Sequence, residues 1–400
     1  KWSRRQRWGY VITPSPHKQM EKEHNILLNV DEFTFTILLN NKDIVEKWIM
    51  YAENIIYKFV RISRLENIFD GKLSEMSSEK LEGYDKCYNM GLKDYYFAMA
   101  YHTCRMDMGV CIKFSAKAWA IYQARYSKMY GVQIILPAFL QKLNGNIDSV
   151  TIRLTRIDFT VDYYNYGIDL NELHTKLQDK KILVQDDTDR CRIRKTSFVG
   201  EDGAIQTIYI GSRSKGSKGF LRIYDKKMEQ IKNNGFRLED AIKNNSWIRF
   251  EVVYKGMYAH SITEELLKED LTDQEFASFI AKAVTQKYRL YDIEKGEYRI
   301  ETKKLIEIAE KSNAARLRCD SPRDNSLRQS IQYIIFSSGL FSLIYKIEQL
   351  FGIDGVDEFI DYLRSCYFNN VWKGATMTRE LNLWVKKHED LSKGKLEDNF

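Results

Sequence analysis

The stretch Ser149–Tyr164 has the sequence SVTIRLTRIDFTVDYY, in which polar and apolar side chains alternate. A period of two predicts a β-strand whose two faces differ in character. Within RIDFTVD this period places Arg156, Asp158, Thr160 and Asp162 on one face and the apolar residues between them on the other. The chain has enough apolar residues to build a core, and this long strand carries two acids on one face. It is therefore important which residues lie on the same face of the neighbouring strands.

Two later stretches have the same property. In RIYDK, Arg222 and Tyr224 share a face and Lys226 lies just beyond the strand, whereas in RFEVV the pair that shares a face is Arg249 and Glu251. If the three strands are neighbours, their polar faces form one cluster of carboxylates, cations and a tyrosine hydroxyl. Each piece alone has an ordinary alternative, namely an exposed strand face, a surface ion-pair ladder or a packed tyrosine. Only the combination favours a site.

The chemistry of such a cluster is that of phosphodiesters. Carboxylate oxygens are the ligands that Mg²⁺ and Mn²⁺ prefer, and a bound cation can polarise a phosphodiester. A tyrosine hydroxyl can then attack phosphorus, provided that nearby positive charge favours its phenolate. The sequence therefore predicts Mg²⁺ or Mn²⁺ as cofactor and Tyr224 as nucleophile.

The remaining pattern predicts an α+β domain followed by a mainly helical region. Strands are expected at 30–39, 108–114, 205–210, 220–224 and 247–254, and helices at 41–62, 116–130, 137–143 and 225–234. Beyond residue 260 we expect helices that start at capping boxes over 261–264 and 272–275, and a helix over 337–350 that Gly352 ends. The predicted division is a basic N-terminal arm (1–25), an α+β domain with an antiparallel sheet and flanking helices (26–260), and a mainly helical C-terminal region (261–400) for DNA recognition or dimerisation.

Positive charge is concentrated in one segment. The chain has a net charge of +7, and residues 190–227 contain ten Lys and Arg against three Asp and Glu. A polyanion is the natural partner of such a segment, although a solvated loop face would have the same composition. The loop Gly211–Gly219 has Ser217-Lys218 where a nucleotide-binding loop has Lys-Ser, and a strand follows it, so we interpret it as a hairpin that contacts DNA phosphates. The predicted DNA-binding residues are Arg192, Arg194, Lys195, Arg213, Lys215, Lys218 and Lys227.

Several classes of protein are disfavoured. The six cysteines form no C-x-x-C pair, so neither a zinc site nor a disulfide framework is expected. No run of 18 uncharged apolar residues predicts a membrane span, and the first residues do not resemble a signal peptide. These features indicate a cytoplasmic protein that has no membrane partner.

The three motifs together resemble the replication initiation factor family, also called Rep_trans. They occur in the order RIDFTVD, TIYIGSRSKGSKGFLRIYDKKMEQ and WIRFEVVYKG, and the resemblance is good over about residues 149–260. It is weaker from Val30 to Gly131 and only general beyond residue 260. The family includes initiators of rolling-circle plasmids of Gram-positive bacteria and relaxases of integrative and conjugative elements.

This resemblance implies a DNA nicking-closing enzyme that initiates rolling-circle replication at an origin nicked as a single strand. The enzyme forms a 5′-phosphotyrosyl link and leaves a free 3′-hydroxyl. The tyrosine of the family's R-x-Y-[DE]-K motif corresponds to Tyr224, with Tyr209 as the reserve nucleophile, and Lys226 and Arg222 assist. The motif acids, as metal ligands, correspond to Asp158, Glu251, Asp162 and, more loosely, Asp31. A homodimer and a host helicase as partners are family-level expectations alone.

Alternatives within and outside the family stay open to different degrees. A relaxase would use the same chemistry at a transfer origin, but residues 1–40 lack the helix-turn-helix pattern of several conjugative relatives. A non-catalytic DNA-binding regulator would keep the basic segment and should lose the acid cluster. A tyrosine recombinase would need a His-x-x-Arg motif, and neither His260 nor His388 has Arg three residues later. The six histidines form no H-x-H pair, so a metal site would depend on carboxylates.

Overall fold

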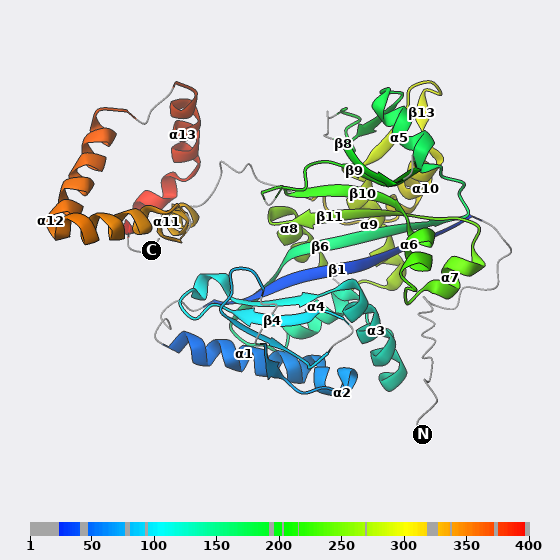
Figure 1. Ribbon diagram of the computed structural model, residues 1–400, viewed down its shortest axis with the longest axis horizontal. Helices are drawn as coiled ribbons and strands as arrows, with labels where there is room; N and C mark the ends of the chain where they lie inside the picture. Colours follow the sequence, from blue (N-terminus) through cyan, green and yellow to red (C-terminus); the bar gives the residue numbers. More distant parts are fainter. Residues whose placement is uncertain are drawn as a thin grey trace. The chain divides into compact units, whose positions relative to one another are not determined.

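The computed structural model describes residues 24–40, 47–76, 81–92, 95–191, 196–201, 204–214, 216–268, 270–317, 327–336, 338–371 and 375–396. The chain divides into two compact units, Lys1–Arg318 and Cys319–Phe400. The first unit contains a large antiparallel sheet with flanking helices, and the described part of the second consists of helices (Figure 1). The predicted fold class is therefore confirmed.

The main sheet has ten strands in the order β2-β3-β4-β5-β1-β6-β11-β10-β9-β8, and neighbouring strands are antiparallel. Its strands are β1 (Asn25–Leu39), β2 (Ser74–Glu75), β3 (Lys86–Asn89), β4 (Phe97–Tyr101), β5 (Val110–Phe114), β6 (Val150–Tyr164), β8 (Thr196–Glu201), β9 (Ala204–Ile210), β10 (Gly219–Asp225) and β11 (Trp247–Lys255). A second sheet has the order β13-β12-β7 and consists of β7 (Ile182–Gln185), β12 (Arg289–Asp292) and β13 (Glu297–Tyr298).

The central strands β1 and β6 pair along almost their whole length, with two irregularities. From Val30 to Phe33 β1 takes three steps while β6 takes two, so β1 contains one extra residue there. The acidic pair Asp31-Glu32 occupies this bulge. The extra residue shifts the alternation of β1 by one position, so Val30 and Phe33 both reach the core although they are three residues apart.

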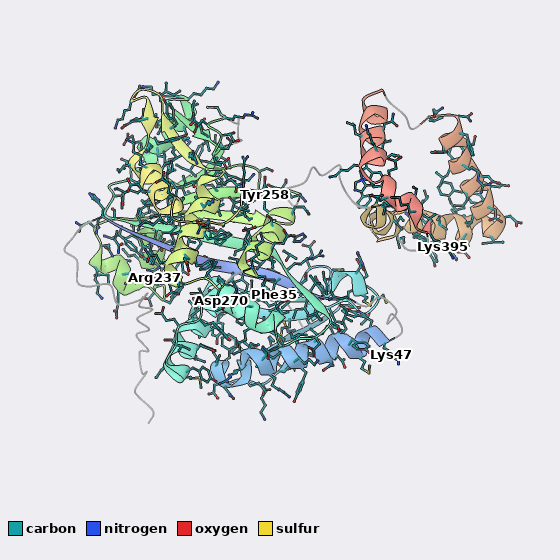
Figure 2. The ribbon with its side chains drawn as sticks, turned by 180° about the vertical axis from the view of Figure 1, so that it is seen from behind. Phe35, Lys47, Arg237, Tyr258, Asp270 and Lys395 are labelled. Carbon is teal, nitrogen blue, oxygen red and sulfur yellow. The ribbon has the colours of Figure 1, made fainter. Side chains whose placement is uncertain are left out.

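Helices cover one face of the sheet. On the β5 and β1 side they are α1 (Trp48–Ser63), α2 (Leu65–Phe69), α3 (Ala116–Tyr130) and α4 (Leu136–Asn144). Phe139 of α4 lies at the centre of this packing, with ring-to-ring contacts to Phe33, Phe35, Phe59, Phe114, Trp119 and Tyr122. Figure 2 shows the core from the opposite side, with Phe35 of β1 labelled. Burial of these aromatic side chains is the main stabilising contribution on this side.

The β6 and β11 half of the same face is covered by α8 (Met257–Leu266) and α9 (Asp273–Thr285), and α10 (Ile300–Ala309) packs on α9. Phe159 contacts Phe279 of α9, and the buried Tyr163 donates a hydrogen bond to the carbonyl of Glu301. Because these helices complete the core, the first compact unit continues to Arg318, beyond the boundary that we expected near residue 260. The sequence signal changes there because strands give way to helices, not because packing ends.

The expected helix starts have mixed outcomes. Thr272 forms the predicted capping box with Glu275, and Asp225 caps α6 (Lys226–Lys232). The capping box predicted at 261–264 is wrong, because α8 already begins at Met257 and contains Ser261. Gly256 precedes α8 with a φ of 55°, which glycine adopts at low cost, and this turn starts the helix directly after β11. The described part of the unit also contains the short helices α5 (Leu170–Gln178) and α7 (Leu238–Lys243) and the 3₁₀ helix η2 (Met106–Met108).

The second unit contains α11 (Leu327–Phe336), α12 (Leu340–Phe368), α13 (Ala375–Lys387) and the 3₁₀ helix η3 (Glu389–Lys393). Gly352 interrupts α12 with φ 74° and ψ −174°, so the expected stop is a break between two helical stretches. Across the described ranges, we find no helix with the length and apolar character that a bilayer crossing requires.

A substitution tests the aromatic core. We expect Phe139→Ala to lower the free energy of unfolding by about 3–5 kcal/mol, because it leaves a cavity among six aromatic rings. Urea denaturation followed by circular dichroism measures the change. Tyr57→Ala is the control, since 63% of Tyr57 is exposed and we expect a change within about 0.5 kcal/mol. Equal effects of the two changes would contradict this account of the core.

Candidate active site

The strands that carry the three motifs are neighbours, in the order β6-β11-β10. Glu251 lies opposite Thr160, and Arg249 lies opposite Asp162. On the other side of β11, Arg222 lies opposite Glu251, and Tyr224 lies opposite Arg249. Residues opposite each other in a sheet point to the same face, so the predicted assembly of the polar faces is confirmed. The helices α8 and α9 lie on the opposite face, whereas α6 and α7 pack against one end of this polar face.

Asp162 is at the centre of one ion-pair network. Its side chain is fully buried, and Arg249 binds both of its oxygens, with Nε–Oδ1 and Nη2–Oδ2 distances of 2.6 and 2.9 Å. Arg237, from the start of α7, approaches Asp162 Oδ2 at 3.2 Å. The third nitrogen of the Arg249 guanidinium lies 3.0 Å from Oδ1 of Asp31. Burial by itself would raise the pKa of Asp162, but the two guanidinium groups hold it below its usual value.

Asp158 belongs to a second network on the same face, and its side chain is also buried. Arg156 binds both of its oxygens at 2.9 and 2.6 Å. Arg156 also lies 2.9 Å from Glu32 Oε1, and Lys113 lies 3.2 Å from that atom, yet neither contact has hydrogen-bond geometry. Burial raises the pKa of Asp158 to about 7, against the effect of Arg156 and together with the charges of Glu251 and Glu32. Three acids thus lie close enough to repel one another.

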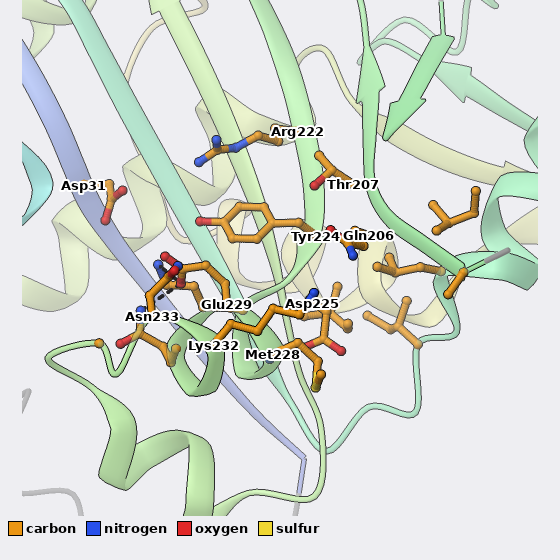
Figure 3. Close-up of a pocket in the computed structure, with 18 of the residues that line it drawn as sticks. Asp31, Gln206, Thr207, Arg222, Tyr224, Asp225, Met228, Glu229, Lys232 and Asn233 are labelled. Atoms are coloured by element: carbon orange, nitrogen blue, oxygen red, sulfur yellow. Dashed lines mark hydrogen bonds and ion pairs between the residues drawn. The ribbon is translucent and has the colours of Figure 1, made fainter. Parts of the chain in front are cut away.

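Tyr224 lies between these networks. Its hydroxyl donates a hydrogen bond to Glu251 Oε2 at 3.2 Å, and the same oxygen accepts a bond of 2.6 Å from Arg222. The Arg222 guanidinium lies 4.5 Å and the Lys226 ammonium 5.6 Å from the centre of the tyrosine ring. Figure 3 shows the ring below Arg222, with its hydroxyl directed towards Asp31. The tyrosine is held by an acceptor and two cations on one side of the sheet.

Burial determines the protonation state of the Tyr224 hydroxyl. It raises the pKa of Tyr224 above its usual value, since the negative charge of Glu251 adds to the effect and Arg249 only opposes it. The tyrosine is therefore a neutral hydrogen-bond donor in this structure. Burial also lowers the pKa of Lys226, and Arg249 lowers it further, although Asp31 and Glu229 act in the other direction. A lysine with a lowered pKa releases its proton more readily than an exposed one.

A cavity of about 990 Å³ opens beside Tyr224. Its wall includes Asp31 from β1, Thr207 from β9, Arg222 and Tyr224 from β10, and residues of α6 such as Glu229 (Figure 3). The cavity therefore reaches the tyrosine from the α6 end of β10. It is large enough for a nucleotide.

The predicted metal ligands are not arranged as a metal centre. Among the described residues, no group of three or more His, Cys, Asp or Glu side chains could hold an ion. Asp158, Glu251, Asp162 and Asp31 each have an arginine nitrogen within 3.0 Å. In this arrangement guanidinium groups bind the oxygens of these carboxylates, so a divalent cation would have to displace an arginine to reach them.

The predicted DNA-binding residues have different surroundings. Arg192, Arg194, Lys195 and Lys215 lie outside the described residues. Arg213 is exposed in the β9–β10 hairpin, and Lys218 lies next to the start of β10. Lys227, by contrast, donates hydrogen bonds to the carbonyls of Asn244 and Asn245. Its ammonium group holds the turn before β11.

Sequence reasoning missed two residues of the site, Glu32 and Arg237, and the pairing of a third, Arg156. Glu32 was overlooked because strict alternation would direct it to the core, and only the bulge in β1 turns it outward. Arg156 was placed on the correct face, but its two-oxygen pairing with Asp158 has no sequence signal. Arg237 reaches Asp162 across 75 positions of the chain, and no local pattern predicts that contact.

The raised pKa of Asp158 predicts a pH-dependent stability. The folded protein keeps this proton up to about pH 7, whereas the unfolded chain releases it near its usual value of 3.8. Wild type should therefore lose stability relative to Asp158→Asn as the pH rises from about 4 to about 7, by on the order of 1–3 kcal/mol. Urea denaturation of both proteins at several pH values measures the difference.

Asp162→Asn is the matched control. Since the pKa of Asp162 is lowered, its contribution to stability is complete above 3.8 and should not change between about pH 5 and about pH 8. The difference in the free energy of unfolding between wild type and Asp158→Asn should change with pH. If it is constant over the same pH range, the proposed environment of Asp158 is contradicted.

Comparisons with known proteins agree with the motifs. A family model described as replication initiation factor matches residues 152–340. A solved structure of a rolling circle replication initiator protein from Geobacillus stearothermophilus is 15% identical, with a TM-score of 0.46, over 72% of this chain and 98% of that chain. No curated protein sequence matches. The resemblance carried by the three motifs is thus confirmed, because residues 152–340 of this chain match the model of the replication initiation factor family.

Proposed function

We propose that this protein is a site- and strand-specific DNA nicking-closing enzyme that initiates rolling-circle replication, with Tyr224 as its nucleophile. The observation that carries the proposal is the contact between the Tyr224 hydroxyl and Glu251 Oε2, beside Arg222 and at the wall of a cavity. A hydroxyl, a proton acceptor and cations within reach of one space are the groups that phosphoryl transfer to tyrosine requires.

In the proposed nicking step, the Tyr224 oxygen attacks phosphorus and its proton passes to Glu251 Oε2. The bond between phosphorus and the 3′-oxygen breaks, giving a 5′-phosphotyrosyl link. The departing 3′-oxygen takes a proton from Lys226, whose lowered pKa suits this role, and becomes a 3′-hydroxyl. In the closing step the 3′-hydroxyl attacks the phosphotyrosine and each proton returns to its donor.

The cations of the site support binding of the phosphate. The side chains of Arg222 and Arg156 are each 35% exposed, although each also pairs with a buried carboxylate. Guanidinium groups form two-point hydrogen bonds with phosphates as they do with carboxylates. A phosphate that enters beside Tyr224 therefore meets donors that are already oriented by Glu251 and Asp158.

One observation favours a second candidate, a non-catalytic DNA-binding regulator. The acids of the described site are all paired with arginines, and Tyr224 is neutral and buried. The regulator would bind the origin without forming a covalent link. A relaxase acting at a transfer origin would share every step of the proposed chemistry, so only the identity of the DNA separates it from an initiator. A homodimer and a host helicase remain predictions from the family.

The nucleophile has a direct test. We expect wild type to form a denaturation-resistant adduct with single-stranded and supercoiled DNA that carries its origin, and Tyr224→Phe to reduce the adduct by at least about 10³-fold, because no oxygen remains to attack phosphorus. Gel electrophoresis of labelled DNA after denaturation measures it. Tyr209→Phe, which removes a hydroxyl on the adjacent strand, should keep the adduct. Loss with Tyr209→Phe alone would move the nucleophile to β9, and tight origin binding without any adduct would favour the regulator.

Metal dependence is a separate prediction. Because the family resemblance implies Mg²⁺ or Mn²⁺, we expect removal of divalent cations with EDTA to abolish the adduct, and either ion to restore it. Direct titration of wild type with Mn²⁺ should show one site that Asp158→Asn or Glu251→Gln weakens at least about tenfold. Adduct formation that is unchanged in EDTA would mean that the arginine pairs supply the positive charge of the site without an ion.

A further inference from the structure

We propose that Tyr209 and Phe220 form a stacking subsite for the bases of single-stranded DNA next to the nicked phosphate. The two side chains lie on the same sheet face as Tyr224, at the hairpin end of β9 and β10. Tyr209 lies opposite Arg222 in the register, and Phe220 precedes Arg222 by two residues on β10. The proposal rests on the proposed function and identifies where the substrate lies in the site.

The two rings stand out from the residues around them. Their centroids are 6.3 Å apart with an angle of 54° between the planes, and both side chains are half-buried. Their strand neighbours Ile208, Ile210 and Leu221 point to the opposite face and are buried in the core. Tyr209 and Phe220 are therefore not needed to fill that core. Their outer surfaces offer aromatic area on a face that otherwise carries charges.

The cations around the rings also differ from those around Tyr224. The Arg213 guanidinium lies 4.1 Å from the centre of the Tyr209 ring, and the Lys255 ammonium lies 5.6 Å from that of Phe220. Within the described parts of the chain, neither these two cations nor Lys218 form an ion pair with a carboxylate. Arg222, Arg249 and Lys226, by contrast, each have a carboxylate partner. The cations at the hairpin end are thus available to an external anion.

Aromatic rings combined with unpaired cations suit single-stranded nucleic acid. Exposed bases stack on aromatic side chains whatever their sequence, and the cations bind the phosphates between them. Bases in a duplex are already stacked on each other and cannot use the rings. An acidic protein surface would use the cations but gain little from two half-buried rings.

The position of the rings relative to the cavity gives the subsite its role. The cavity meets Tyr224 from the α6 side and includes neither ring, whereas Phe220 lies four residues before Tyr224 on the same strand. Tyr224 and Arg222, which both line the cavity, therefore lie between its α6 end and the ring pair. A strand that places its scissile phosphate at Tyr224 would place bases on one side of it in the cavity and bases on the other side on the rings.

The experiment measures equilibrium binding of a fluorescently labelled 12-nucleotide single strand of mixed sequence by anisotropy. We expect Tyr209→Leu and Phe220→Leu each to weaken binding about fivefold to hundredfold, whereas Tyr209→Phe, which keeps the ring, retains wild-type affinity. The matched control is Phe198→Leu, since Phe198 is 54% exposed on the neighbouring β8 but lies opposite Ile208 on the other face. Thermal unfolding followed by circular dichroism checks that each variant is folded.

Two further arms separate the outcomes. Binding of the same sequence as a duplex should change less than threefold in the leucine variants, and the triple change of Arg213, Lys218 and Lys255 to Gln should lower the salt dependence of single-strand binding by a slope of about 2. Unchanged single-strand affinity in both leucine variants, or an equal loss for duplex, overturns the subsite. If only the adduct assay fails, the nicking proposal is overturned. The binding results then still decide whether the stacking subsite exists.

Discussion

Buried charge on the polar face of the central sheet requires an opposite charge at hydrogen-bond distance. Asp162 and Arg249 are both almost fully inaccessible to solvent, and an isolated ion at such a depth would cost several kcal/mol. Their two-point contact, extended by Arg237 and Asp31, removes most of that cost. The positions of β1, β6, β11 and α7 are thereby linked through one set of ion pairs. The position of Tyr224 depends on this set of ion pairs, because β10 pairs with β11.

Tyr224 depends on the network through the register of β10 against β11. A shift of one residue would turn Tyr224 and Arg222 into the apolar core and bring Ile223 to the polar face. The register is fixed by Ile223 and Phe250, which are buried on the core side, as much as by the charges. The helix-covered face therefore determines where the hydroxyl lies on the other face. Packing and chemistry are coupled by the alternation of side chains along a strand.

The same alternation explains what the sequence could predict. It assigned Asp158, Asp162, Glu251, Arg249, Arg222 and Tyr224 to matching faces of three strands, and the antiparallel register bears this out. It could not predict Glu32, since a bulge breaks the period, nor Arg237, since a contact over 75 positions depends on the tertiary fold. The domain boundary was misplaced for a related reason. A change from strands to helices is visible in the sequence, whereas the packing of α9 and α10 on the sheet is not.

Charge counted along the sequence also differs from charge available in the structure. The segment 190–227 carries a large positive excess, yet three of its described cations are occupied within the fold: Arg222 by Glu251, Lys226 by Glu229, and Lys227 by two carbonyls. Arg213 and Lys218 contribute to the external field in full because no carboxylate in the described chain opposes them. Among the cations of this segment that the structure describes, these two of the β9–β10 hairpin therefore remain available to a polyanion. Close to Tyr224, the guanidinium groups act over short distances, and their geometry matters more than their number.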